Sequence, residues 1–271
     1  MIRILFGFVI LFYSAAFLIY GAACGGRPSR WLKAGVFLEL GFLIHTFFIF
    51  VEASAAHTLV PIGTFGEVLI FFAWSVAFVY VVLLRRVRQD MFGVILIPFL
   101  LLLLVPAPFM THGHSLPASY FDDHHFLIHI LSAFFAYASF TLSAVAAILY
   151  LTQAHALKSK QISNFYKQLP PLKELERFVF YTVAWGFVLL LIAIAGGAFW
   201  SKRMVGTYLV AEPKTIASLL TFGVYGFVLY LHSASIASGK RMARVVIFAF
   251  MLVLFTFVGT SFLNNQLHVG I

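Results

Sequence analysis

The residues of this chain most able to do chemistry are its ten histidines, which only nine carboxylates accompany. A neutral imidazole ligates iron, zinc or copper through one ring nitrogen. The single cysteine, Cys24, excludes a disulfide framework, a CxxC redox pair and a cysteine-rich metal centre. The sequence has no GxSxG, HExxH or phosphate-binding glycine motif. It therefore indicates ligation by histidine rather than catalysis by a nucleophile.

These histidines must be positioned by membrane helices. The 271 residues are 62% hydrophobic and 10% charged, with 33 phenylalanines, which no soluble domain could bury. The N-terminal segment lacks a convincing cleavage site and is long enough to span, so we expect it to be retained. We predict an all-α bundle of about eight spans, forming one integral membrane domain over residues 1–271. The spans are 4–22, 34–52, 65–84, 91–109, 125–152, 177–199, 215–233 and 245–263.

The distribution of basic residues orients the spans. Fourteen of the eighteen lysines and arginines follow spans one, three, five and seven, which predicts that those loops are cytoplasmic. The same placement explains the net charge of +9 without nucleic acid. Both termini then lie on the non-cytoplasmic side, together with loops 53–64, 110–124 and 200–214 and the tail 264–271. The inner loop 153–176 is the one sizeable soluble segment.

The two histidines that this topology brings to one level are His129 and His268. His129 lies about one helical turn below the outer surface, and a stripe of small residues is expected to bury it against neighbouring helices. His268 follows the last span. The stretch 200–215, WSKRMVGTYLVAEPKT, separates two apolar runs at the same level, and we interpret it as an interfacial platform. Two imidazoles beside such a platform suit axial ligation of haem iron. The aromatic side chains that would pack against the porphyrin are Phe134, Phe135, Trp200 and Tyr208.

Other interpretations of these residues remain open. A single histidine near a helix end is usually an interfacial group that reaches toward water. His112, His114, His124 and His125 could form an outer zinc or copper site with Asp122 and Asp123. His45, at mid-membrane, either bonds a backbone carbonyl or acts as a ligand. A metal transporter would need more intramembrane carboxylates than Glu39 alone. Gly196-Gly197 indicates close helix packing.

Four stretches give the chain a resemblance to the cytochrome c assembly family of polytopic haem-handling proteins, which includes the CcsA, CcmC and HemX-like proteins. They are GFLIHTFFIF with PIGTFGEVLIFFAW, FLIHILSAFFAYASFTLSAVAAILYL, the segment from LPPLKELERF to AGGAFW, and YGFVLYLH with FTFVGTSFLNNQLH. The resemblance covers about residues 40–268. It implies that His129 and His268 are the outer axial pair for a non-covalent haem b. It also implies that His232 and His45 belong to an inner or transmembrane haem position.

The tryptophan-rich motif of this family is degenerate here. The family pattern is approximately W-x5-G-x-Y-W-x-W-D-P-K-E, and Trp200, Gly206, Tyr208, Pro213 and Lys214 match it. Val205, Leu209 and Ala211 stand at positions of other tryptophans, Glu212 at the aspartate and Thr215 at the last glutamate. The chain thus resembles the HemX-like members more than a working synthase subunit.

The resemblance implies a protein of the bacterial inner membrane that hands over or exports haem, and it favours a non-catalytic or haem-handling subunit of a cytochrome c synthase over an enzyme. Its expected partners are membrane lipid and haem, with a second cytochrome c synthase subunit, an apocytochrome or a tetrapyrrole-synthesis enzyme as alternatives. A different hypothesis is a haem-free regulator or scaffold of tetrapyrrole synthesis, which would bind a soluble enzyme through the basic loop 153–176.

Overall fold

The computed structural model describes residues 2–24, 29–84, 92–110, 118–160, 165–166, 169–234 and 239–259. These residues form helices and connecting turns, and no strand occurs among them. The predicted all-α class is therefore confirmed for the described part of the chain. His268, His112 and His114 lie outside the described residues.

The helices follow the predicted spans closely, because each apolar run is bounded by polar or glycine-containing segments. They are α1 (Ile2–Cys24), α2 (Ser29–Ala55), α3 (Phe65–Leu84), α4 (Gly93–Leu104), α5 (His124–Lys158), α7 (Leu172–Val205), α8 (Pro213–Ser233) and α9 (Gly239–Leu254). Short 3₁₀ turns cover Ala107–Phe109 and Ala118–Asp122, and a π-helical turn, η4, covers Phe255–Gly259. Six of the described helices, α1, α2, α3, α5, α7 and α8, are long and apolar enough to cross a membrane. Helices α4 and α9 are shorter.

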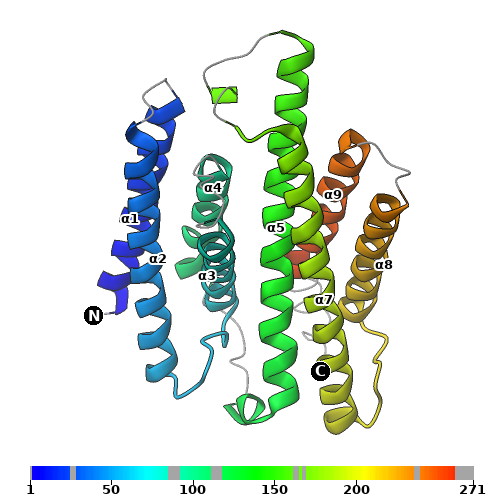
Figure 1. The fold of residues 1–271 in the computed structure, drawn as a ribbon. Helices are drawn as coiled ribbons and strands as arrows, with labels where there is room; N and C mark the ends of the chain where they lie inside the picture. Colours follow the sequence, from blue (N-terminus) through cyan, green and yellow to red (C-terminus); the bar gives the residue numbers. More distant parts are fainter. Residues whose placement is uncertain are drawn as a thin grey trace. The chain divides into compact units, whose positions relative to one another are not determined.

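The chain divides into two compact units (Figure 1). Unit 1 comprises residues 1–122 and 155–171, and α1 and α2 pack along each other within it. Helix α3 begins with a capping box. The Thr64 hydroxyl accepts a hydrogen bond from the Glu67 N–H at 3.2 Å, and Glu67 accepts one from the Thr64 N–H at 3.4 Å. Glu67, which belongs to the family-like stretch, thus fixes where α3 starts.

Unit 2 comprises residues 123–154 and 172–271, and its described part holds His124, His125, His129 and His232 of the histidines singled out above. Helices α5 and α8 run in one direction, and α7 and α9 run in the opposite direction (Figure 1). In its core the Phe140 ring of α5 stacks on the Tyr225 ring of α8, with centroids 3.6 Å apart and planes 7° apart. The predicted small-residue stripe of α5 is buried, including Ala136, Ser139, Ser143 and Ala147.

Two of the predicted loops are wrong in extent. The stretch 200–215 is not one loop, because α7 continues through Val205 and α8 begins at Pro213, so only residues 206–212 link the two helices. The inner loop 153–176 is also shorter, since α5 extends to Lys158 and α7 starts at Leu172. In both places the helix continues beyond the apolar run. Lysine, arginine, glutamate, glutamine and methionine, which are frequent in these extensions, have high helix propensity.

The stacked pair in unit 2 depends on Gly186 of α7. A Cβ atom on Gly186 would lie 2.5 Å from the Phe140 ring, so we expect Gly186→Ala to force that ring off Tyr225 and destabilise the protein by about 2 kcal/mol. Gly223→Ala on α8 is the matched control, because no heavy atom lies within 4 Å of its added Cβ. Thermal unfolding in detergent measures both variants. Equal midpoints would contradict the packing described.

Candidate functional site

His129 projects from the first turns of α5 toward α7. Its ring Nδ1 lies 2.6 Å from the backbone carbonyl oxygen of Ala193. A carbonyl oxygen only accepts hydrogen bonds, so Nδ1 must carry the proton and donate it. The remaining nitrogen, Nε2, then holds the free lone pair, and it makes no hydrogen bond with a described residue. This is the arrangement in which imidazole acts as a metal ligand with its other nitrogen held by the protein.

Two glycines of α7 allow this contact. A Cβ on Gly196 would lie 3.1 Å from the backbone nitrogen of His129, and one on Gly197 would lie 2.7 Å from its ring Nδ1. Any side chain at residue 197 would therefore displace the imidazole. The interpretation of Gly196-Gly197 as close helix packing is confirmed, and the packed partner is the candidate ligand itself.

Aromatic side chains lie at the start of α5 and the end of α7. The Trp200 and Phe126 rings lie with centroids 5.1 Å apart, and Phe199 meets Tyr208 edge to face at 6.0 Å. Tyr208 is 53% exposed, and Met204 and Leu209 beside it are also exposed. Of the residues predicted to form a platform, Trp200 thus lies near the end of α7 and Tyr208 in the 206–212 link.

The end of α7 is closed by local hydrogen bonds. Gly206 adopts a φ of 83°, the left-handed conformation typical of a glycine that terminates a helix. The Lys202 Nζ donates to the Gly206 carbonyl at 2.7 Å and lies 5.3 Å from the centre of the Tyr208 ring. The Ser201 hydroxyl donates to the Thr207 carbonyl at 2.8 Å. These contacts fix how the chain carrying Tyr208 leaves the helix.

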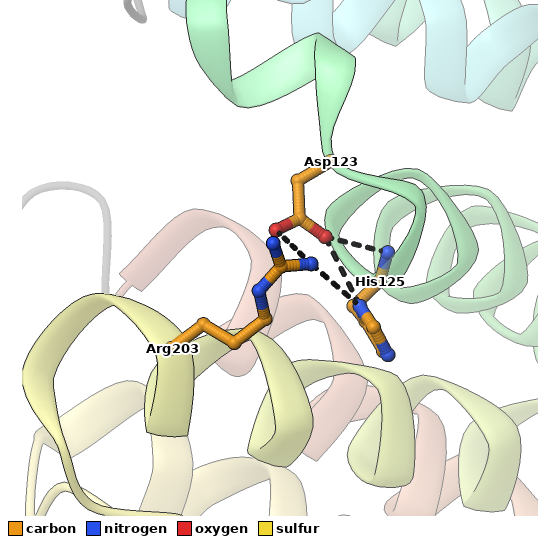
Figure 2. Close-up of polar contacts among 3 residues, drawn as sticks. All are labelled: Asp123, His125 and Arg203. Atoms are coloured by element: carbon orange, nitrogen blue, oxygen red, sulfur yellow. Dashed lines mark hydrogen bonds and ion pairs between the residues drawn. The ribbon is translucent and has the colours of Figure 1, made fainter.

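A charged cluster joins the start of α5 to the end of α7 (Figure 2). Asp123 precedes the first helical residue, and its Oδ1 accepts the His125 backbone N–H at 2.8 Å, which caps the helix. The same oxygen lies 3.2 Å from His125 Nδ1, and Oδ2 lies 3.1 Å from Arg203 Nη1. Desolvation raises the pKa of Asp123, but the hydrogen bonds from His125 and the charge of Arg203 outweigh it and lower the pKa below its usual value.

His232 lies far from His129 within unit 2. Its ring stacks on Phe180 at 4.1 Å, and its Nδ1 lies 3.2 Å from the Met242 sulfur. Along α7, Phe180 and Ala193 are thirteen residues apart, a separation of about 20 Å at helical rise. The two imidazoles therefore cannot ligate one iron. As at His129, the acceptor is an atom that cannot donate, which places the proton on Nδ1.

His45 is fully buried in unit 1. The Tyr13 hydroxyl lies 3.4 Å from its Nδ1, and the ring is close to the backbone of Ile70. Its Nε2 nevertheless makes no hydrogen bond of ordinary geometry with any described residue. The side chain is enclosed by aromatic rings, including Phe48 with its centroid 6.4 Å away.

The alternative zinc or copper site keeps only part of its predicted ligands within the described residues. His124 is exposed at the start of α5, and His125 is held by Asp123. Across the described ranges, no group of three histidine, cysteine or carboxylate side chains is arranged to hold a metal ion. His112 and His114 lie outside those ranges.

Several residues that shape the site escaped the sequence analysis. The Ala193 carbonyl, the Met242 thioether and the Tyr13 hydroxyl each engage Nδ1 of a histidine. No spacing rule would reveal them, since each lies on a different helix from its partner. Asp123 was recognised only as a possible metal ligand. Its position just before an apolar helical run is a helix-cap signal that the sequence does contain.

The fold and the histidine sites define a multi-pass helical membrane protein. Residues 62–268 match the family model described as cytochrome C assembly protein, and the chain belongs to this family. It is 25% identical over 263 residues to Protein HemX of Brevibacillus brevis, covering 95% of each chain. It is 25% identical over 229 residues to the cytochrome c biogenesis protein CcsA of Guillardia theta, covering 77% of this chain and 75% of that one.

The Asp123 contacts predict a pH dependence. Because its pKa is lowered on folding, the carboxylate stabilises the fold above its unfolded pKa of about 3.9, and this stabilisation is lost as the pH falls through the lower folded value. Asp123→Asn should thus lower the midpoint of thermal unfolding near pH 7, by an amount that shrinks below about pH 4. Asp122→Asn is the control, since Asp122 pairs with no described residue. A pH-independent difference would contradict this assignment.

Proposed function

We propose that this protein holds haem b non-covalently at the outer end of unit 2, with His129 and His268 as axial ligands, for handover or export. The observation that carries the proposal is the His129 ring. Its Nδ1–H is donated to Ala193, and its Nε2 has no hydrogen bond with a described residue. An imidazole held in this way presents a lone pair of fixed direction, as axial ligation requires.

The course of the last helix supports the pairing with His268. At the end of α9, in η4, the Phe257 ring meets Phe134 and Tyr137 of α5 with centroids 6.1 and 6.2 Å away. Phe134 lies five residues, about 7.5 Å, inward of His129. His268 follows Phe257 by eleven residues, and a chain of that length can span up to about 35 Å. The sequence therefore leaves ample chain to reach the level of His129.

The aromatic surface supports a flat, amphipathic ligand. Trp200 lies next to Phe126, and Tyr208 is exposed beside Phe199. Aromatic faces of this kind pack against a macrocycle. Haem supplies an iron that changes redox state and exchanges axial ligands. The residues of this chain would bind and orient it. The proposed mechanism is ligand handover rather than bond-making by a side chain, which is a haem-handling role.

We extend the proposal to a second haem position for His232, with His45 as a weaker candidate. His232 has its Nδ1 engaged by Met242 and its ring plane fixed by Phe180, which supports a ligand role. The enclosed ring of His45 would have to move before its Nε2 could reach an iron. This difference favours His232 as the ligand of an inner site.

We propose eight spans with both termini on the non-cytoplasmic side of a bacterial inner membrane. The basic residues that follow alternate spans support this orientation, and α4 and α9 supply the two shorter spans. The relatives named for cytochrome c biogenesis favour a second synthase subunit or an apocytochrome as partner.

A second candidate function is a membrane scaffold for an enzyme of tetrapyrrole synthesis. It is favoured by the exposed cationic surface at the inner end of α5, where Lys158 and Lys160 are exposed and Leu157 is 47% exposed. The binding segment would be residues 159–171, since the flanking residues are helical.

Substitution of both proposed ligands separates these functions. We expect His129→Ala with His268→Ala to abolish the Soret band and the bis-histidine α-band of the purified, haem-loaded and reduced protein, because both axial bonds are lost. His124→Ala, an exposed histidine on the same helix end, should keep both bands. A double variant with the unchanged spectrum would refute the proposal. The scaffold would be favoured if tetrapyrrole synthesis in cells is unchanged by the double histidine substitution but is impaired when residues 159–171 are replaced with a neutral linker.

A further inference from the structure

Three lysines and arginines lie together at the outer end of unit 2, against the general pattern of the chain. Fourteen of the eighteen basic residues follow spans one, three, five and seven, at the predicted inner side, and Lys202, Arg203 and Lys214 are three of the remaining four. Basic residues on the non-cytoplasmic side do not help to orient the spans. Their concentration within thirteen residues of the chain therefore needs another explanation.

Contacts within the protein explain two of these three cations. Arg203 pairs with Asp123 at 3.1 Å, and Lys202 donates to the Gly206 carbonyl at 2.7 Å. Lys214 is exposed, and its ammonium group makes neither a hydrogen bond nor an ion pair with any described residue, whereas its backbone carbonyl accepts the Ser218 hydroxyl at 2.8 Å. It also stands in the first turn of α8, where the helix dipole disfavours a positive charge. Among the described residues, the neighbouring Glu212 is the one negative charge that acts on it.

The register of α5 and α8 places Lys214 at the level of His129. The two helices run in the same direction (Figure 1), and Phe140 and Tyr225 are stacked face to face between them. His129 lies eleven residues before Phe140, and Lys214 lies eleven residues before Tyr225. Eleven residues advance a helix by about 16 Å and return it to nearly the same face. The two residues therefore share a level within unit 2.

We infer that Lys214 binds a carboxylate of the tetrapyrrole held by His129, and so selects ligands that carry a free carboxylate. A flat ligand whose iron meets His129 Nε2 would extend its edge toward neighbouring helices at that level. On α8, the ammonium of Lys214 has no partner among the described residues. A lysine ammonium recognises a carboxylate as a point charge. The unfavourable placement of Lys214 in the free protein is then offset when the anionic ligand binds. This inference rests on the proposed function and adds the chemical class of ligand.

The test compares haem with haem dimethyl ester, whose carboxylates are blocked. Binding to the detergent-solubilised full chain is followed by the Soret band. We expect wild-type protein to bind haem about tenfold more tightly than the ester, and Lys214→Gln to bind both equally, at the weaker affinity. Lys214→Arg keeps the charge and should retain most of the discrimination. Lys240→Gln removes a charge from the exposed inner end of α9 and should leave the ratio unchanged.

The outcomes separate this inference from the proposed function. Equal affinity of the wild-type protein for haem and its ester would overturn the inference without any variant, and so would a Lys214→Gln protein that keeps the full preference. In either case a normal bis-histidine spectrum would leave the proposed function standing. A wild-type protein that forms no Soret band with either compound would overturn both.

Discussion

The hydrogen bond from His129 Nδ1 to the Ala193 carbonyl is the interaction on which the proposed haem site depends. It fixes the tautomer, the direction of the ring and the nitrogen that remains free. In the low-dielectric interior of a helix bundle, burying a polar group without a hydrogen-bond partner costs free energy. The bond to Ala193 removes that cost for Nδ1 of the partly buried His129 ring. A side chain held in this way is poised as a ligand before any ligand arrives.

The remaining architecture of unit 2 maintains that bond. The approach of α7 to α5 is possible because Gly196 and Gly197 lack side chains at the contact. The Asp123–Arg203 pair joins the ends of the same two helices beyond the histidine. The stacked rings of Phe140 and Tyr225 set the register of α8 against α5. Gly196 and Gly197, the Asp123–Arg203 ion pair and the Phe140–Tyr225 stack thus hold α5, α7 and α8 in the arrangement on which the proposed site depends.

Most of the fold could be predicted because apolar runs of about twenty residues must cross a membrane as helices. The burial of the α5 stripe and the packing role of Gly196-Gly197 followed from side-chain size. The helix ends could not be predicted so well, since Trp200–Val205 are polar enough for a loop and yet continue α7. The groups that orient the histidines were hidden for a different reason. A backbone carbonyl has no sequence signature, and Met242 and Tyr13 meet their partners only through tertiary packing.

The protonation site of the His129 ring tests the central claim most directly. Nitrogen NMR of the ¹⁵N-histidine-labelled, ligand-free protein, with the His129 signal assigned by its loss in His129→Ala, distinguishes the two neutral tautomers. A protonated Nδ1 and an unprotonated Nε2 are the predicted result. A proton found on Nε2 would mean that the free lone pair faces Ala193 rather than a ligand, and would contradict the proposed role of His129.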